Sequence, residues 1–230
     1  MKIARDFILP KKDPSLVLYL PLYKLDGASF MSKDAYGHLC TATGALWTPR
    51  GRDFDGVDDC VGCGNPVSLQ ITGGISILSW CKPDTIVGND TIATKFDAAG
   101  NQRAYTFYLS AGVVTWTLSS TLTPFTGAIR SSKTTLTAGR WYFLAGTFVP
   151  AVSQDVYLNG QLDNGALSGT IPTGIANSPR NLAIGGGYNN STTPNADWFD
   201  GLIGVVLILR RAFTALEILN YYLATKWRYQ

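Results

Sequence analysis

Residues 139–160 read G-R-W-Y-F-L-A-G-T-F-V-P-A-V-S-Q-D-V-Y-L-N-G, a pattern of extended runs and a tight turn. Its aromatic and β-branched run Trp141–Phe148 is typical of a central strand. A second run, Asp155–Leu158, is followed by Asn159-Gly160 and a short third run to Asp163. Asn-Gly favours the tight turn of a β-hairpin because both residues tolerate positive φ. The stretch therefore predicts antiparallel β-structure.

The same pattern of strands and turns continues on both sides of this stretch. Ser110-Ala111-Gly112 separates two β-runs in the manner of a hairpin turn. Because no helical segments alternate with the strands, we expect an all-β fold, an antiparallel two-sheet jelly-roll sandwich. The further runs are Leu16–Leu22, Ile75–Lys82, Ala104–Leu109, Val113–Leu118, Leu182–Gly185 and Leu202–Leu209.

One short helix is expected, at the C-terminal end of the chain. The segment 214–217, T-A-L-E, is a capping box. In such a box the Thr hydroxyl and the Glu carboxylate each accept a hydrogen bond from the other residue's backbone N–H. The apolar residues that then recur at helical spacing are Leu216, Leu219, Tyr222 and Leu223. We expect a helix over about 214–227 that packs on an end or edge of the sandwich.

Composition excludes several classes of protein. The chain has 230 residues, 15% of them charged, and a formal net charge of +3. So small a charge gives no basis for binding nucleic acid or a membrane surface. No run reaches the roughly 20 apolar residues of a transmembrane helix. Residues 1–6 carry charges where a signal peptide has its apolar segment, so we expect no signal peptide, a cytoplasmic protein when made, and reduced cysteines.

Five segments, in order along the chain, now resemble one family. Residues 54–61 read F-D-G-V-D-D-C-V, and residues 75–83 read I-S-I-L-S-W-C-K-P. The stretch 139–160 supplies two more segments, and residues 199–217 read F-D-G-L-I-G-V-V-L-I-L-R-R-A-F-T-A-L-E. Over about residues 16–224 this pattern resembles the laminin-G-like, concanavalin A-like lectin and glucanase jelly-roll domains.

No linker divides the chain, so we expect one jelly-roll domain over residues 15–230. Residues 1–14 form an extended N-terminal arm in this interpretation, since Pro10 and Pro14 limit regular structure there. We expect Trp80 and Trp141 to be core aromatics, because large buried rings dominate sandwich cores.

The sequence offers no catalytic site. Glycoside hydrolases use two carboxylates, whereas Glu217 is the only Glu of the chain and already caps the helix. Asp58 and Asp59 are adjacent, so on a strand they would face opposite sides. His38 is the only His, and no nucleophile motif accompanies it. We expect no enzyme activity, with glycoside hydrolysis as the remaining alternative.

Calcium is the metal that the resemblance implies, held by acidic residues of the strand that follows Phe199. This chain has Gly204 and Val205 at those acidic positions. Calcium takes six to eight oxygen ligands, to which Asp55 and Asp58 could still contribute. We nevertheless expect no cofactor and no metal.

The four cysteines include a C-x-x-C spacing at Cys60 and Cys63. A structural zinc site needs four ligands, and only Cys40, Cys81 and His38 remain as candidates. Small buried thiols are the favoured interpretation. The sequence leaves open a Cys60–Cys81 or a Cys40–Cys63 contact.

The loop from Gly185 to Asp200 is the candidate ligand-binding site. Tyr188 and Trp198 could stack on a sugar ring. The side chains that could bond its hydroxyls are Asn189, Asn190, Asn195 and Asp197. The alternative is an ordinary exposed loop with its two aromatics tucked inward.

Two functions fit a non-catalytic binding or structural module of this kind. A jelly roll without a leader is similar to modules of bacteriophage virion proteins, which predicts a capsid-decoration, tail or fibre component. Its arm would dock on a neighbour in an oligomer or larger assembly. The alternative is a stand-alone, lectin-like carbohydrate-binding protein. The expected partners are protein assembly subunits or a glycan, with no nucleic acid and no membrane.

Overall fold

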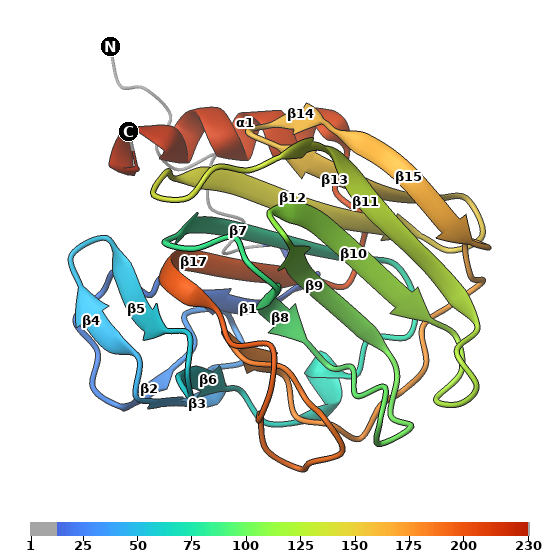
Figure 1. The fold of residues 1–230 in the computed structure, drawn as a ribbon, viewed down its shortest axis with the longest axis horizontal. Coiled ribbons are helices and arrows are strands. Elements are labelled where there is room, and N and C mark those ends of the chain that lie inside the picture. The colour runs from blue at the N-terminus through green and yellow to red at the C-terminus, as the bar shows by residue number, and fades with distance from the viewer. Residues whose placement is uncertain (1–12, 230) are drawn as a thin grey trace.

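The computed structural model describes residues 13–229 and is a sandwich of two antiparallel sheets. Figure 1 shows the sheets facing each other, with one α-helix against the outer face of the first sheet. The predicted fold class, including the single short C-terminal helix, is therefore confirmed. Most of the predicted arm, residues 1–12, lies outside the described residues. Within residues 13–229 no helix is long and apolar enough to cross a membrane.

The first sheet is built around the strands of the 139–160 stretch. Its eight strands run in the order β14-β13-β12-β7-β17-β5-β4, with β1 also paired to β17. Asn159 and Gly160 both have positive φ, 49° and 82°, as the predicted hairpin turn requires. The strands are β1 (Leu16–Leu20), β4 (Leu46–Thr48), β5 (Gly51–Asp55), β7 (Ile75–Pro83), β12 (Tyr142–Val149), β13 (Ser153–Leu158), β14 (Gln161–Leu162) and β17 (Asp200–Leu209).

The second sheet has nine strands, in the order β15-β11-β10-β9-β8-β16-β6-β3-β2. Only β9, β10 and β16 were expected from the sequence, because the other strands are short or rich in Ser and Thr. The strands are β2 (Ser29–Met31), β3 (Leu39–Thr43), β6 (Cys60–Gly62), β8 (Asn89–Thr94), β9 (Tyr105–Ser110), β10 (Val113–Ser119), β11 (Gly127–Thr135), β15 (Asn164–Gly169) and β16 (Ala183–Ile184).

The main core lies between the inner faces of the two sheets. Trp116 and Phe107 of the second sheet are fully buried and meet edge to face, with ring centroids 5.7 Å apart. Gly146 of β12 faces them, and a Cβ there would lie only 3.1 Å from the Trp116 ring. Aromatic rings of one sheet thus occupy space that a glycine leaves open on the other.

A second apolar cluster lies between the first sheet and helix α1 (Ala215–Thr225), which a short 3₁₀ turn, Lys226–Arg228, extends. The predicted capping box between Thr214 and Glu217 is present. The predicted apolar stripe is only half right: Leu219 and Tyr222 are partly buried, and Tyr222 packs against this cluster, but Leu216 and Leu223 are 65% and 48% exposed. The buried residues of the helix are instead Ile218 and Tyr221. The helix covers the outer face of the first sheet, not an end or edge of the sandwich as predicted. The rings of Trp80 and Phe143 point outward from that face and pack against Tyr222 and Tyr221 of the helix.

Tyr229, which follows the 3₁₀ turn, completes this cluster. Its ring centroid lies 4.6 Å from that of Trp80 and 4.6 Å from that of Trp141, which is only partly buried. Gly204 of β17 lies directly beneath it, and a Cβ there would be 2.4 Å from the Tyr229 ring. The glycine at this position therefore provides the space that the tyrosine occupies.

We expect Gly204→Ala to lower the free energy of unfolding by about 2 kcal/mol, because the added methyl group overpacks a buried site. Thermal unfolding of the variant measures this. Gly62→Ala is the matched control, since a Cβ on that strand glycine meets nothing within 4 Å. Equal stability of the two variants would contradict the packing of Tyr229 on Gly204.

Candidate functional site

The outer face of the second sheet carries a groove of about 400 Å³. Strand alternation produces it, because β9 turns Tyr105, Phe107 and Leu109 into the core and leaves Thr106 and Tyr108 facing outward. Thr117 of β10 and Thr91 of β8 lie beside them in the groove lining. The floor is thus a row of hydroxyl groups around one tyrosine ring.

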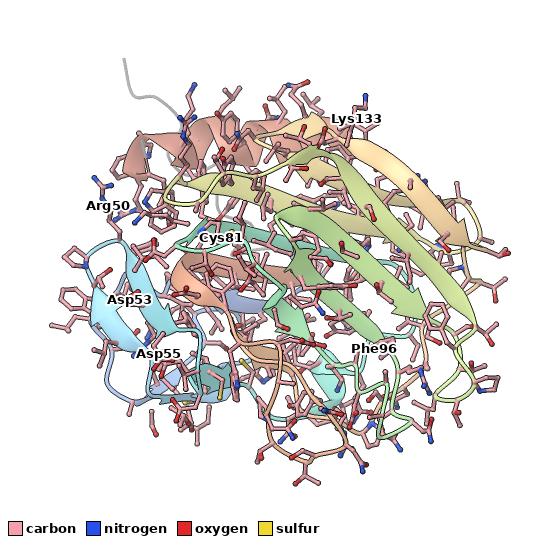
Figure 2. All side chains as sticks on the ribbon, viewed as in Figure 1. Arg50, Asp53, Asp55, Cys81, Phe96 and Lys133 are labelled. Atoms are coloured by element: carbon pink, nitrogen blue, oxygen red, sulfur yellow. The ribbon has the colours of Figure 1, made fainter. Side chains whose placement is uncertain are left out.

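Two loops that carry Phe96 and Phe125 form one wall of the groove. The two rings meet edge to face with centroids 6.3 Å apart, and Figure 2 places Phe96 beside the front sheet. Arg103 joins the loops by donating to the Ala98 carbonyl at 2.7 Å and to the Leu122 carbonyl at 3.0 Å. This cross-link holds the aromatic pair over the end of the groove.

The predicted binding loop contributes to the opposite wall through Gly187, Tyr188 and Asp197. Tyr188 is only 6% exposed, and its hydroxyl donates to the Asn181 carbonyl at 2.8 Å. Because its ring is largely covered, a role for Tyr188 in stacking on a sugar stays a prediction. Trp198 is half-buried against Gly186 and does not line the groove.

The three predicted asparagines mainly hold the loop together. The Asn195 side chain accepts from the Asn189 backbone N–H at 2.8 Å and donates to the Asn189 carbonyl at 3.1 Å. The Asn190 backbone N–H donates to the Asp97 carboxylate at 2.9 Å. A role for these side chains in ligand binding stays a prediction.

Asp97 ties the groove walls to each other. It is fully buried and accepts hydrogen bonds from the Gly100 backbone N–H at 2.7 Å and from Arg180 Nη2 at 2.6 Å, in addition to Asn190. Burial opposes its ionisation, but these backbone donors and the guanidinium outweigh it and hold the pKa of Asp97 below its ordinary value. The carboxylate therefore fixes the relative position of the 97–102 turn and the 185–200 loop.

The charged residues that line the groove are Arg103 and Asp197. Arg103 belongs to the end with the aromatic pair, whereas Asp197 lies near Thr91 and Tyr108 at the other end. Burial raises the pKa of Asp197, and a hydrogen bond from the Asn89 side chain opposes that rise. A groove of hydroxyls, aromatic rings and few charges is suited to a polar, largely uncharged ligand such as a sugar chain.

Behind the groove, Asp90 of β8 is buried with an oxygen, Oδ2, that has no hydrogen-bond partner within residues 13–229. Burial, followed by the nearby charge of Asp200, raises the pKa of Asp90 to about 7. The folded protein therefore keeps a proton that the unfolded chain loses above its ordinary value of 3.8. Linkage then predicts a contribution to stability that is complete below about pH 4 and lost as the pH rises to about 7.

We expect Asp90→Asn to remove this pH dependence, making the variant more stable than the natural chain at pH 8 but not at pH 4. Urea unfolding of both proteins across this range measures the difference. If the free energy of unfolding changed equally in the natural chain and in the variant between pH 5 and pH 7, that result would contradict a raised pKa of Asp90.

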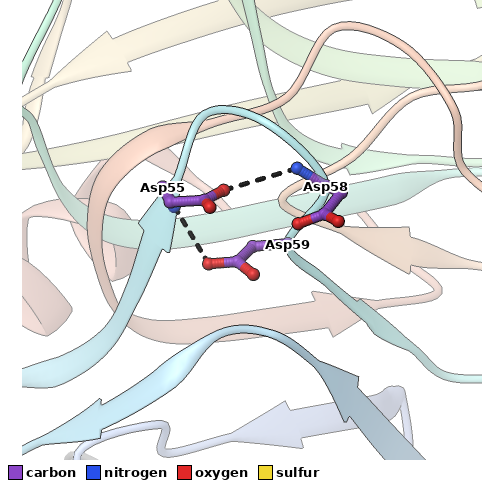
Figure 3. Close-up of side chains that lie close together, drawn as sticks. All are labelled: Asp55, Asp58 and Asp59. Atoms are coloured by element: carbon purple, nitrogen blue, oxygen red, sulfur yellow. Dashed lines mark hydrogen bonds between the residues drawn. The ribbon is translucent and has the colours of Figure 1, made fainter.

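Three carboxylates, those of Asp55, Asp58 and Asp59, gather at the turn after β5, with oxygens within 4.8 Å of one another (Figure 3). Asp55 Oδ1 already accepts from the Val57 and Asp58 backbone N–H groups, and Asp59 Oδ2 accepts from the Asp55 backbone N–H. The acidic position that the resemblance implies is occupied by Gly204 beneath Tyr229. The residues present therefore do not match the calcium ligands that the resemblance implies. The carboxylates lie close together because those of Asp55 and Asp59 accept the backbone hydrogen bonds of a turn.

The remaining candidates for chemistry have structural roles. His38 Nε2 lies 3.0 Å from the Val17 carbonyl and 3.1 Å from Ser68 Oγ. All four cysteines are buried and free. Within residues 13–229 no cysteine or histidine belongs to a cluster of three or more residues of metal-ligating type.

The groove floor was missed by the sequence interpretation, although its signal was present. The hairpin of 104–118 was expected, and its alternation places Thr106, Tyr108 and Thr117 on the face opposite the core. An aromatic residue among threonines on the exposed face of a predicted hairpin indicates a candidate binding surface. The walls could not be predicted, because they come from loops far apart in the sequence.

Comparison with known proteins extends these observations. Residues 55–219 match the model of the concanavalin A-like lectin/glucanases superfamily. No curated protein matches the chain in sequence. Among solved structures, the receptor binding domain of botulinum neurotoxin D is similar, with a TM-score of 0.64 and 14% identity over 90% of this chain and 52% of that one.

Two further structures are similar in fold. One, from a study of cell entry of botulinum neurotoxin type C through interaction with two ganglioside molecules, has a TM-score of 0.63 and 12% identity over 91% of this chain and 51% of that one. The other is Trypanosoma rangeli sialidase in complex with sialic acid, with a TM-score of 0.65 and 16% identity over 93% of this chain and 33% of that one. The chain thus spans between a third and about half of these neighbours' lengths, and at such identities the likeness shows the fold alone.

Proposed function

Because this chain belongs to the concanavalin A-like lectin/glucanases superfamily, we propose that it is a lectin-like protein that binds a glycan in the groove of the second sheet. The observation that carries the proposal is the groove itself. Threonine hydroxyls can bond the hydroxyls of a sugar, while Tyr108 and the Phe96–Phe125 pair can cover the apolar faces of its rings.

The neighbours lend support of a general kind. The botulinum neurotoxin type C structure is described as interacting with ganglioside molecules, and the sialidase structure contains sialic acid. The neurotoxin DC binding domain is in complex with a protein, rat synaptotagmin II. A glycan partner agrees with the first two, and the chemistry of the groove favours a glycan over a protein here.

We further propose that the protein binds its glycan without cleaving it. Hydrolysis by two carboxylates needs an acid and a nucleophile or base on either side of the bond. Asp197 is the one carboxylate in the groove lining, among the residues that the structure describes. Incubation with oligosaccharides that bind, followed by chromatography of the products, should therefore return the oligosaccharides intact.

A glycan array tests the binding proposal. The natural chain should bind at least one immobilised oligosaccharide, and Thr106→Arg should abolish this binding, because the long side chain fills the middle of the groove. Ser110→Arg is the matched control, since Ser110 lies on the same face of the same strand but outside the groove lining. Absence of binding by the natural chain, or equal loss in both variants, would contradict the proposal.

A virion role and an oligomeric assembly stay predictions of the sequence, and Asp13 suggests a test. The Asp13 carboxylate accepts from Arg211 Nη2 at 2.7 Å, and the same guanidinium pairs with Glu217 at 2.7 Å. This contact holds Asp13 against Arg211 and the start of helix α1. The mass in solution of the full chain should exceed one protomer and fall in a chain lacking residues 1–12, whereas two monomers would contradict assembly through the arm.

A further inference from the structure

Cys40 and Cys63 lie opposite each other on neighbouring strands of the second sheet. Strands β3 and β6 are antiparallel, with Thr41 opposite Gly62 and Ala42 opposite Val61. The same register, continued by one residue, places Cys40 opposite Cys63. Side chains of directly opposite residues point to the same face of a sheet, and here both thiols are fully buried in the main core.

The hydrogen bonds of the two strands show which kind of pair this is. The Cys63 backbone N–H donates to the Leu182 carbonyl at 2.8 Å, on the side away from β3. The Ala42 backbone N–H donates to the Ala28 carbonyl at 2.7 Å. Cys40, two residues earlier, therefore also turns its backbone toward β2, away from β6. The cysteines thus form a non-hydrogen-bonded pair, the type in which opposite Cα atoms approach to about 4.5 Å and the side chains are closer.

That separation falls within the range of about 4.4–6.8 Å between Cα atoms that a disulfide requires. The thiols also influence each other, because the Cys40 thiol, together with burial, raises the pKa of the Cys63 thiol. The other cysteines are less well placed. Val61 and Cys63 face the core, so strand alternation turns Cys60 to the opposite face, and Cys81 belongs to β7 of the first sheet.

We propose that Cys40 and Cys63 form a site for a cross-strand disulfide, a modification that is independent of glycan binding. The oxidant is a small disulfide such as glutathione disulfide. One cysteine thiolate attacks it, forming a mixed disulfide and releasing one glutathione thiolate. The second cysteine thiolate then attacks the protein sulfur of the mixed disulfide and releases the second glutathione. The protein loses two electrons and two protons, and one glutathione disulfide becomes two thiols.

Burial determines when this reaction takes place. Both thiols are covered in the folded protein, and the nucleophile is the thiolate, which burial disfavours. The disulfide therefore forms while β3 and β6 pair during folding, and slowly in the folded state. Once formed, it closes a loop that includes the turn of Asp55–Asp59 and stabilises the fold against heat.

The test is to refold the full chain in a glutathione redox buffer, quench thiol exchange with acid, block the free thiols with iodoacetamide under denaturing conditions and measure the intact mass. We expect two blocked cysteines, a Cys40–Cys63 peptide in the digest, and a higher melting temperature than that of the reduced protein. Cys60→Ser and Cys81→Ser should still form the link, whereas Cys40→Ser and Cys63→Ser should not. The native protein is treated with glutathione disulfide in parallel, so that a failure to refold does not leave the result undecided.

Four blocked cysteines under both conditions would overturn the proposal, as would a link that includes Cys60 or Cys81. Because glycan binding is measured separately with the reduced protein, failure of the disulfide leaves the proposed function unaffected.

Discussion

Asp97→Ala should lower the free energy of unfolding by about 3 kcal/mol and weaken binding in the groove, because it leaves a largely buried guanidinium without its partner. Arg180 Nη2 lies 2.6 Å from the Asp97 carboxylate. The backbone N–H groups of Gly100 and Asn190 also lose their acceptor. Since these groups belong to two separate loops, the substitution should loosen the groove wall as well as the fold.

Urea unfolding measures the effect, and Asp58→Ala is the matched control. Asp58 is exposed, and substitutions at exposed sites away from such networks usually change stability by less than about 0.5 kcal/mol. The folded-state pKa of Asp97 is lowered, so its contribution is present above the ordinary value of 3.8 and lost as the pH falls below it. The difference between the two variants should therefore shrink as the pH falls below 3.8, and a difference that stays constant would contradict the ion pair as its main source.

Tyr108→Ala should weaken glycan binding by about tenfold to a hundredfold, the effect of removing an aromatic residue at the centre of a binding site. Tyr108 is half-buried on β9 and faces outward between Thr91 and Thr115. Its removal takes away the one aromatic ring of the groove floor and leaves the core side of the strand unchanged.

Isothermal titration with an oligosaccharide that the natural chain binds measures this loss. Tyr36→Ala is the matched control, because Tyr36 is an exposed tyrosine that stacks on His38, away from the groove lining. Trp198→Ala separates the groove from the loop tip, and it should retain most of the affinity. Loss of binding in Trp198→Ala with full binding in Tyr108→Ala would place the site in the loop instead.

The first sheet could be predicted because its central strands are continuous apolar runs. Strands β7, β12 and β17 are buried on both faces, by the sandwich core and by helix α1, so most of their residues are apolar. The turn at Asn159-Gly160 indicated that the flanking strands, β13 and β14, are antiparallel. The face of the helix could not be predicted, because it depends on where the rings of Trp80 and Phe143 lie beneath it.

The second sheet was harder to predict because several of its strands are rich in polar residues, some of which line the candidate site. Strand β8 reads N-D-T-I-A-T and β11 reads G-A-I-R-S-S-K-T-T, in which polar residues resemble those of loops. Three of the polar residues of β8, Asn89, Thr91 and Thr94, line the groove, so one face of this strand is polar. The predicted loop supplied Asp197 to the groove wall, whereas most of the floor lies on the outward face of β9 and β10, two strands that were predicted but not recognised as part of a site.

Hydrogen exchange of the protein with and without a bound oligosaccharide reports where the glycan lies. Slower exchange should appear in β8, in the hairpin of β9 and β10, and in residues 187–198. Exchange in helix α1 and in the turn of Asp55–Asp59 should not change. Protection confined to the helix or to that turn, with the strands of the groove unaffected, would contradict a glycan site on the second sheet.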